Sequence, residues 1–106
     1  MNDNDKLNKL LTVSNPLIVI EKLKDYLKKN NIKDDINLYI SNKKNKKYMI
    51  NVNGKAISFG DIRYSDHTKN KDNLRRLNYL NRTSNIKGNW KDNIFSPNNL
   101  SRELLW

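Results

Sequence analysis

The side chains of this sequence best suited to chemistry are its cations. Lys and Arg number 21 against 11 Asp and Glu, so the formal net charge is +10 at pH 7. Phosphate oxygens bind positive charge and N–H donors, and such contacts do not depend on base sequence. The excess therefore favours a polyanionic partner, either DNA or RNA. The residues predicted to contact phosphate are Lys43, Lys44, Lys46, Lys47, Lys71, Arg75 and Arg82.

Part of this set follows a helical spacing. A stripe at positions i, i+4, i+7 and i+11 is formed by Lys71, Arg75, Asn78 and Arg82. Residues at this spacing share one face of a helix. The arginines matter most, because a guanidinium can hold a phosphate or a guanine edge through two hydrogen bonds. The aromatic side chains that can stack on unpaired bases are Tyr39, Tyr48 and Trp90.

A second explanation of the lysines stays open. Asn occurs 20 times and Lys 16 times, and both amino acids have A/T-rich codons. A genome of that composition would raise both counts without any functional pressure. It explains the five arginines less well, all of which lie in the second half of the chain.

Acidic residues are gathered between positions 61 and 72. Carboxylates and an imidazole can hold a divalent cation for phosphodiester cleavage. The candidates are Asp61, Asp66, His67 and Asp72. Two of them have structural explanations, since Asp72 can cap a helix and Asp66 a turn. The chain has no Cys and one His, so we predict a protein that is not an enzyme and uses no metal or cofactor. A metal-dependent nuclease is the third functional class.

Large apolar side chains near the end of the sequence allow two interpretations. Trp is favoured at the centre of protein interfaces. The residues predicted to bind a partner are Trp90, Leu104 and Trp106. In the alternative, the last helix docks on the sheet and closes a core that is short of apolar residues. Tyr64 is interpreted first as a packing residue.

The elements that position these residues are predicted from periodicity. Apolar residues at helical spacing indicate a helix over 14–31, with Ser14 or Asn15 as its cap and Pro16 at its first position. Its core-facing residues are predicted to be Leu17, Ile20, Leu23 and Leu27. Residues 1–13 are predicted to form a short helical lead-in that is frayed or flexible.

The period then changes to that of strands. Strand-like stretches lie at 36–40, 48–52 and 55–59. They predict a three-stranded antiparallel meander over about 36–59. Asn53-Gly54 is a strong signal for a type I′ hairpin, because both positions tolerate a positive φ. Gly60 is predicted to end the sheet.

Two further helices are predicted in the second half. One begins after Asp72, and the other begins at Ser96-Pro97. The inward side of the first is predicted to be Leu74, Leu77 and Leu80. Together the elements predict a single α+β domain over 1–106, in which the meander packs with an N-terminal, a central and a short C-terminal helix. The longest apolar run, 17–20, is far shorter than the ~20 residues that cross a bilayer, so no membrane association is expected.

Residues 38–106 carry a specific order of aromatic, glycine and charged positions. The positions are Lys47–Lys55, Phe59–Gly60, Tyr64, Asp66, Thr68, Lys71–Asp72, Arg75–Arg76, Tyr79–Leu80, Arg82, Ser96–Ser101 and Leu104–Trp106. In this order they resemble a family of short basic proteins encoded mainly by large nucleo-cytoplasmic DNA viruses, the mimivirus-like group especially. That family has no assigned biochemical activity. The resemblance implies a viral origin, an A/T-rich genome and a compact fold.

These observations predict a small viral protein that binds nucleic acid mainly through the phosphate backbone, in virion or genome organisation. Its expected location is the virion or the host-cell cytoplasm, in the virus factory. The alternative is a virion structural component that docks on viral structural proteins through the sheet edge and the C-terminal helix. An exposed sheet edge also allows pairing with a second copy of the chain.

Overall fold

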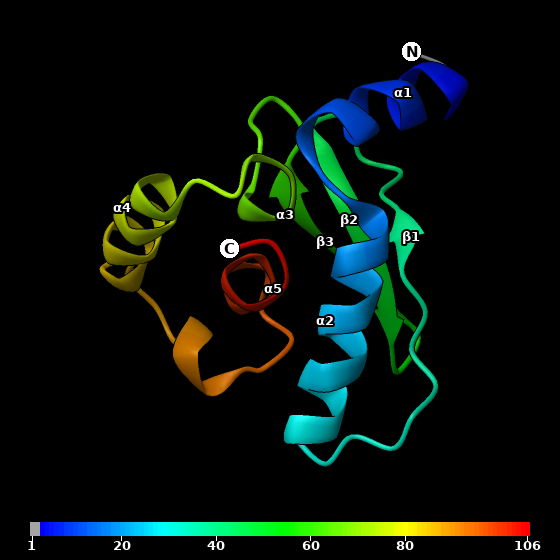
Figure 1. Cartoon of the computed structure of the whole chain (residues 1–106). Coiled ribbons are helices and arrows are strands. Elements are labelled where there is room, and N and C mark those ends of the chain that lie inside the picture. The colour runs from blue at the N-terminus through cyan, green and yellow to red at the C-terminus, as the bar shows by residue number, and fades with distance from the viewer. Residues whose placement is uncertain (1–2) are drawn as a thin grey trace.

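The computed structural model describes residues 3–106, which form five α-helices and a three-stranded antiparallel sheet (Figure 1). The helices are α1 (Asp3–Val13), α2 (Pro16–Lys29), α3 (His67–Asn70), α4 (Asn73–Ser84) and α5 (Pro97–Leu104), with a short 3₁₀ helix η1 (Trp90–Asp92). The strands are β1 (Tyr39–Ile40), β2 (Lys46–Val52) and β3 (Lys55–Asp61). The structure confirms the predicted α+β class and the three-stranded antiparallel meander. Helices α1 and α2 precede the sheet in the chain, and α3, α4 and α5 follow it.

The sheet has the order β1-β2-β3, and both neighbouring pairs are antiparallel. The hairpin between β2 and β3 turns at Asn53 and Gly54, which have φ values of 52° and 78°. These positive angles agree with the type I′ turn predicted from Asn-Gly. The predicted first strand is shorter than expected, since only Tyr39–Ile40 pairs with β2.

Gly60 lies inside β3 and does not end it, so that prediction was wrong. The strand continues to Asp61, which pairs with Lys46. Gly60 has a φ of +82°, and a Cβ built on it would lie 2.7 Å from Cδ1 of Leu105. Glycine is required here both by the backbone angle and by the close approach of the end of α5 to the sheet.

The helix α5 lies at the centre of the molecule, between α2 and α4 and against the sheet (Figure 1). It contacts β3, α2, α4 and η1. Its leucines, Leu100 and Leu104, are fully buried among core side chains of the other helices and of the sheet. The core consists of Leu10, Val13, Val19, Leu23, Tyr26, Leu27, Tyr48, Ile50, Phe59, Ile62, Leu100, Leu104 and Leu105. The interpretation that the last helix docks on the sheet and closes the core is therefore confirmed.

The first two helices differ in detail from their prediction. Leu10 and Val13 of α1 are buried, and Lys6 donates its ammonium hydrogens to the backbone oxygens of Ser41 and Lys43. From Asp3 onward this segment therefore forms the predicted helix, but the helix is packed on the rest of the domain and is not frayed or flexible. Asn15 caps α2 by accepting from the N–H of Leu17, as predicted.

The buried face of α2 is rotated from the predicted one. Leu17 was expected in the core but is exposed at the first turn, and Ile20 is half-buried. Tyr26 takes a place in the core, because its hydroxyl donates to the backbone oxygen of Ile94 at 2.8 Å. The residues that α2 buries are Val19, Leu23, Tyr26 and Leu27.

A buried polar network joins the α1–α2 turn, β2 and α3. The hydroxyl of Tyr48 donates to Oγ of Ser14 at 2.7 Å, and Oγ1 of Thr68 lies 3.3 Å from the same oxygen. Thr68 in turn donates to one carboxylate oxygen of Asp66. The other oxygen accepts from Nζ of Lys47 at 2.9 Å. Each of these polar groups therefore has a hydrogen-bond partner within the protein, as burial requires.

Replacing Tyr48 by Phe is expected to make the protein less sensitive to high pH. Burial raises the pKa of the Tyr48 hydroxyl far above its ordinary value. Above about pH 10 the unfolded chain ionises this group while the folded chain keeps the proton, so stability falls as the pH rises, by up to about 1.4 kcal/mol per pH unit. Chemical denaturation between about pH 10.5 and about pH 12 should give a shallower fall for Tyr48→Phe than for the natural sequence.

At alkaline pH the effect of Tyr48 on stability can be measured separately from that of its neighbour Lys47. Burial lowers the pKa of Lys47, although Asp66 opposes this shift. A lowered lysine pKa makes stability rise with pH only up to the ordinary value of about 10.5, so Lys47 contributes no slope above it. Burial also raises the pKa values of Tyr26 and Tyr79, which affects both proteins equally. Parallel slopes for the two proteins would contradict the role assigned to Tyr48.

Candidate nucleic-acid interface

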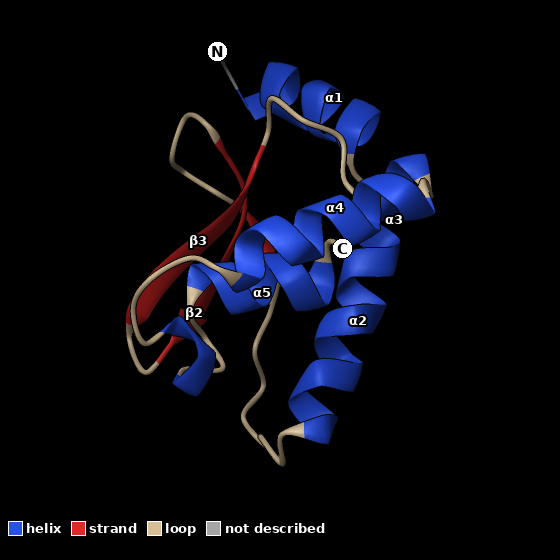
Figure 2. Cartoon of the chain, turned by 90° about the vertical axis from the view of Figure 1, so that its left-hand side faces the viewer, coloured by secondary structure: helices blue, strands red, loops and turns tan. Residues whose placement is uncertain are grey.

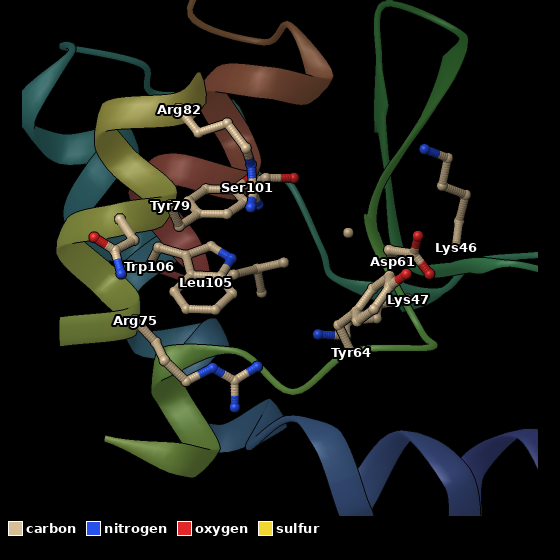
Figure 3. Close-up of a pocket in the computed structure, with 12 residues that line it drawn as sticks. Lys46, Lys47, Asp61, Tyr64, Arg75, Tyr79, Arg82, Ser101, Leu105 and Trp106 are labelled. Carbon is tan, nitrogen blue, oxygen red and sulfur yellow. The ribbon is translucent and has the colours of Figure 1, made fainter. Parts of the chain in front are cut away.

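A cleft of about 670 Å³ lies between α4 and the edge of the sheet (Figure 3). One wall is formed by α4 and by residues at the end of the chain, and the other by the start of β2, the end of β3 and Tyr64. Figure 2 views the molecule from the α4 side and shows this helix in front of α5. The residues that line the cleft are Lys46, Lys47, Gly60, Asp61, Tyr64, Arg75, Asn78, Tyr79, Arg82, Ser101, Leu105 and Trp106.

The orientation of α4 differs from the predicted one, although Leu80 is half-buried as expected. Leu74 and Leu77 were expected to face inward, but their side chains are 67% and 54% exposed. The cationic stripe was expected to face outward, but Arg75 and Arg82 line the cleft, with Asn78 between them. The predicted shared face of these three residues is real, and it is turned toward the sheet.

Contacts from the end of the chain explain this orientation. Arg102 of α5 donates to the backbone oxygen of Leu80 and to Oγ1 of Thr83, both at 2.6 Å. The ring of Tyr79 stacks on Trp106 with 4.5 Å between centroids and 13° between planes. Together these contacts hold the face of α4 that carries Tyr79, Leu80 and Thr83 against α5 and Trp106. Leu74 and Leu77 are then left on the outside.

Local contacts fix the start of α4. Asp72 caps the helix by accepting from the N–H groups of Leu74 and Arg75, as predicted. The guanidinium of Arg75 donates to Oγ of Ser65 at 3.0 Å, which directs it across the mouth of the cleft toward the β3–α3 connection. A neutral hydroxyl leaves the charge of Arg75 uncompensated.

Three cations of the cleft keep their positive charge available. Lys46, Arg75 and Arg82 are exposed, and none of them forms an ion pair with a side-chain carboxylate of residues 4–106. The carboxylate of Asp61 lies in the same cleft but accepts two hydrogen bonds from the Arg63 guanidinium, at 3.0 and 2.7 Å. This hydrogen-bonded guanidinium lowers the pKa of Asp61, so the carboxylate stays ionised and paired. The cleft therefore has a net positive field.

Lys47 was predicted to contact phosphate, and the structure contradicts this. Its side chain is 2% exposed and forms a buried ion pair with Asp66, which is itself fully buried. Desolvation explains why such an ammonium needs a carboxylate partner inside the protein. Lys47 therefore lies at the base of the cleft, and its amine is bound to Asp66 and not accessible to a ligand.

The other predicted phosphate contacts lie outside the cleft. Lys43 and Lys44 are exposed in the loop between β1 and β2. Lys71 is exposed at the end of α3, where its φ of 54° allows the chain to turn into α4. Of the seven predicted residues, the structure thus brings Lys46, Arg75 and Arg82 together at one solvent-accessible surface.

The predicted partner-binding residues take three different positions. Leu104 is fully buried in the core, so its prediction as a contact residue was wrong. Trp90 is half-buried, donates its indole N–H to the backbone oxygen of Ile86, and lies beside the Arg102 guanidinium. Trp106 is half-buried in its stack with Tyr79 and lines the cleft.

The aromatic residues of the cleft were not those predicted to stack on bases. Tyr48 is buried, and Tyr39 and Trp90 do not line the cleft. Tyr64 was interpreted as a packing residue, but its side chain is 60% exposed at the cleft. Tyr79 was missed, although its position four residues after Arg75 placed it on the same helical face.

The acidic cluster of the connector is separated in the structure. Asp61 pairs with Arg63, Asp66 pairs with Lys47, and Asp72 caps α4. Among the side chains of residues 4–106, no group of three or more His, Asp or Glu is placed to hold a metal ion. Over the same residues, no helix is long and apolar enough to cross a membrane.

Comparison with known proteins identifies one similarity. A family model described as a family of unknown function (DUF5754) matches residues 36–83. No curated protein and no solved structure matches the chain. The matched segment extends from just before β1 almost to the end of α4. Over this segment, which holds Lys46, Arg75 and Arg82, the chain is similar to that family.

Proposed function

We propose that this protein binds nucleic acid through the phosphate backbone, using the cations of the cleft between α4 and the sheet. The observation that carries the proposal is that Lys46, Arg75 and Arg82 line one cleft without carboxylate partners among the described residues. A concave surface with cations of one sign concentrates the electric field and attracts polyanions. A codon bias toward lysine would not select arginines at two positions of the cleft wall that lie two helical turns apart.

The chemistry of the wall suits phosphate oxygens. Guanidinium groups present several N–H donors in a plane and remain charged at any physiological pH. Arg75 and Arg82 project from α4, and Lys46 faces them from β2 across the cleft (Figure 3). The exposed Lys43, Lys44 and Lys71 can contact phosphates of a longer strand beyond the cleft.

This binding role is proposed to be non-enzymatic and to serve virion or genome organisation. The support is the resemblance of residues 38–106 to short basic proteins of large DNA viruses. The corresponding location is the virion or the virus factory in the host-cell cytoplasm.

Replacing both cleft arginines is expected to weaken nucleic-acid binding strongly. The variant is Arg75→Gln with Arg82→Gln, and the measurement is the fluorescence anisotropy of a labelled single-stranded oligonucleotide at about 50 mM and about 200 mM salt. Because a hydrogen bond to a charged group contributes roughly 1.5–3 kcal/mol, each arginine should change the Kd at least about tenfold. The slope of log K against log salt should also fall by about 1.4, or 0.7 for each lost contact.

A charge-matched variant separates a specific contact from a loss of overall charge. Lys28→Gln with Lys29→Gln removes the same two charges from the exposed last turn of α2. It should bind nearly as well as the natural sequence. No binding at low salt, or equal weakening by both double variants, would exclude the cleft as the nucleic-acid surface.

A second candidate function is protein interaction within the virion. The observation that favours it is the exposure of Leu74 and Leu77 on the outer face of α4, an apolar surface of the kind that binds proteins. The buried position of Leu104 argues against docking through that residue of the C-terminal helix. Capture of capsid proteins that persists after nuclease treatment and after replacement of Arg75 and Arg82 would favour this function over nucleic-acid binding.

A further inference from the structure

We propose that the cleft accepts an unpaired nucleotide, so that the ligand is single-stranded nucleic acid and not a duplex. The proposal rests on the nucleic-acid binding proposed above and narrows it to one class of strand. Arg75 and Arg82 hold the phosphates, and Tyr64 provides the surface on which the base stacks.

The distribution of charge on α4 is unsuited to a duplex. A helix that reads a duplex groove is a convex element whose outward face carries the polar side chains that reach base edges and phosphates. The outward face of α4 carries Leu74 and Leu77 instead. Its cations Arg75 and Arg82 line the cleft and do not lie on this outward face. A single strand can turn one nucleotide into the concave side.

The size and lining of the cleft fit one nucleotide with its phosphates. Its volume of about 670 Å³ lies within the roughly 300–1,000 Å³ of small-ligand sites. The stacked rings of Tyr79 and Trp106, with Leu105, give its inner wall an apolar surface. Asn78 stands between the two arginines and offers an amide donor and acceptor for a base edge.

Tyr64 is the aromatic residue best placed to stack on a base. Its side chain is 60% exposed, whereas the rings of Tyr79 and Trp106 are already stacked on each other. The Arg63 guanidinium lies 5.8 Å from the centroid of the Tyr64 ring and is itself held by Asp61. This arrangement keeps the ring at the mouth of the cleft, on the sheet side (Figure 3).

The test compares three labelled probes of equal length by fluorescence anisotropy at low salt. The probes are oligothymidylate, oligouridylate and a DNA duplex. We expect a single strand to bind more tightly than the duplex, and the two single strands distinguish a DNA source from an RNA source of the same chemistry. Tyr64→Leu should weaken binding of the single strand by about 5- to 150-fold, the usual effect of losing one stacked base. Tyr64→Phe, which keeps the ring, should bind like the natural sequence.

The control variant is Tyr39→Leu, which removes an exposed tyrosine from β1 outside the cleft. It should leave the binding of all three probes unchanged. If the duplex binds as tightly as the single strands, or if Tyr64→Leu and Tyr39→Leu have equal effects, the single-strand proposal is overturned while the phosphate-binding function stands. If none of the three probes binds at low salt, both proposals fail together.

Discussion

Asp66→Asn is expected to lower the free energy of unfolding by about 3–5 kcal/mol, because it leaves a buried charge without its partner. Nζ of Lys47 lies 2.9 Å from the Asp66 carboxylate, and the two side chains are 2% and 0% exposed. A small domain is stable by only about 5–15 kcal/mol, so this single atom replacement removes a large share of the total. Urea denaturation followed by circular dichroism measures the effect.

Two further variants separate the lost charge pair from other roles of Asp66. Asp66 also caps α3 by accepting from the N–H of Thr68, and Asn can replace Asp as a cap. Asp72→Asn makes the same replacement at an exposed cap and should change stability by no more than a few tenths of a kcal/mol. Adding Lys47→Met to Asp66→Asn should recover part of the loss, because the uncompensated ammonium is then absent. Simple addition of the two single effects would show that the charges are not coupled.

Gly60→Ala is expected to destabilise the protein by about 2–5 kcal/mol, from two separate causes. The φ of +82° is unfavourable for any side chain with a Cβ. The new Cβ would also lie 2.7 Å from Cδ1 of Leu105 and 3.2 Å from two carbons of Lys47. The midpoint of urea unfolding should therefore shift strongly.

Gly54 provides the matched control for this substitution. It has a similar φ of +78° at the hairpin tip, but a Cβ there would have no atom within 4 Å. Gly54→Ala should therefore cost only the conformational part, about 1–2 kcal/mol. The difference between the two variants measures how tightly the end of α5 packs on β3. Equal losses at both glycines would mean that the packing at Gly60 relaxes freely.

The features predicted correctly from the sequence are those determined by neighbouring residues. The hairpin at Asn53-Gly54 follows from the backbone angles that these two residues tolerate. The cap of Asp72 and the cap of Ser96, which accepts from the N–H of Asn99, involve partners no more than three residues away. Such local preferences operate in nearly any tertiary context.

The orientation of α4 could not be predicted in this way. The spacing of Leu74, Leu77 and Leu80 is that of a buried stripe, yet the first two are exposed. The side of α4 that faces the body is selected by Arg102 and Trp106, which lie more than 20 residues beyond most of the positions they contact. Periodicity identifies the faces of a helix but does not say which one a distant segment will cover.

The burial of Lys47 was equally hidden in the sequence. Lys47 follows Lys46, and only the first of the two is exposed. At this point β2 is covered on both faces, since the successive residues Lys47 and Tyr48 project to opposite faces of the strand and both are buried. From a single sequence, a buried lysine whose carboxylate partner lies far along the chain cannot be distinguished from a solvent-exposed lysine beside it.

The contact between Gly60 and Leu105 has a thermodynamic consequence for the cleft. Leu105 belongs both to the hydrophobic core and to the cleft wall, and Trp106 beside it is held by Arg76 through a hydrogen bond to its backbone oxygen. A ligand that requires this wall can bind only the folded chain, so its occupancy and the folding equilibrium are linked. Any molecule that fills the cleft should therefore protect the whole domain against heat, in proportion to the logarithm of its concentration once the site is saturated.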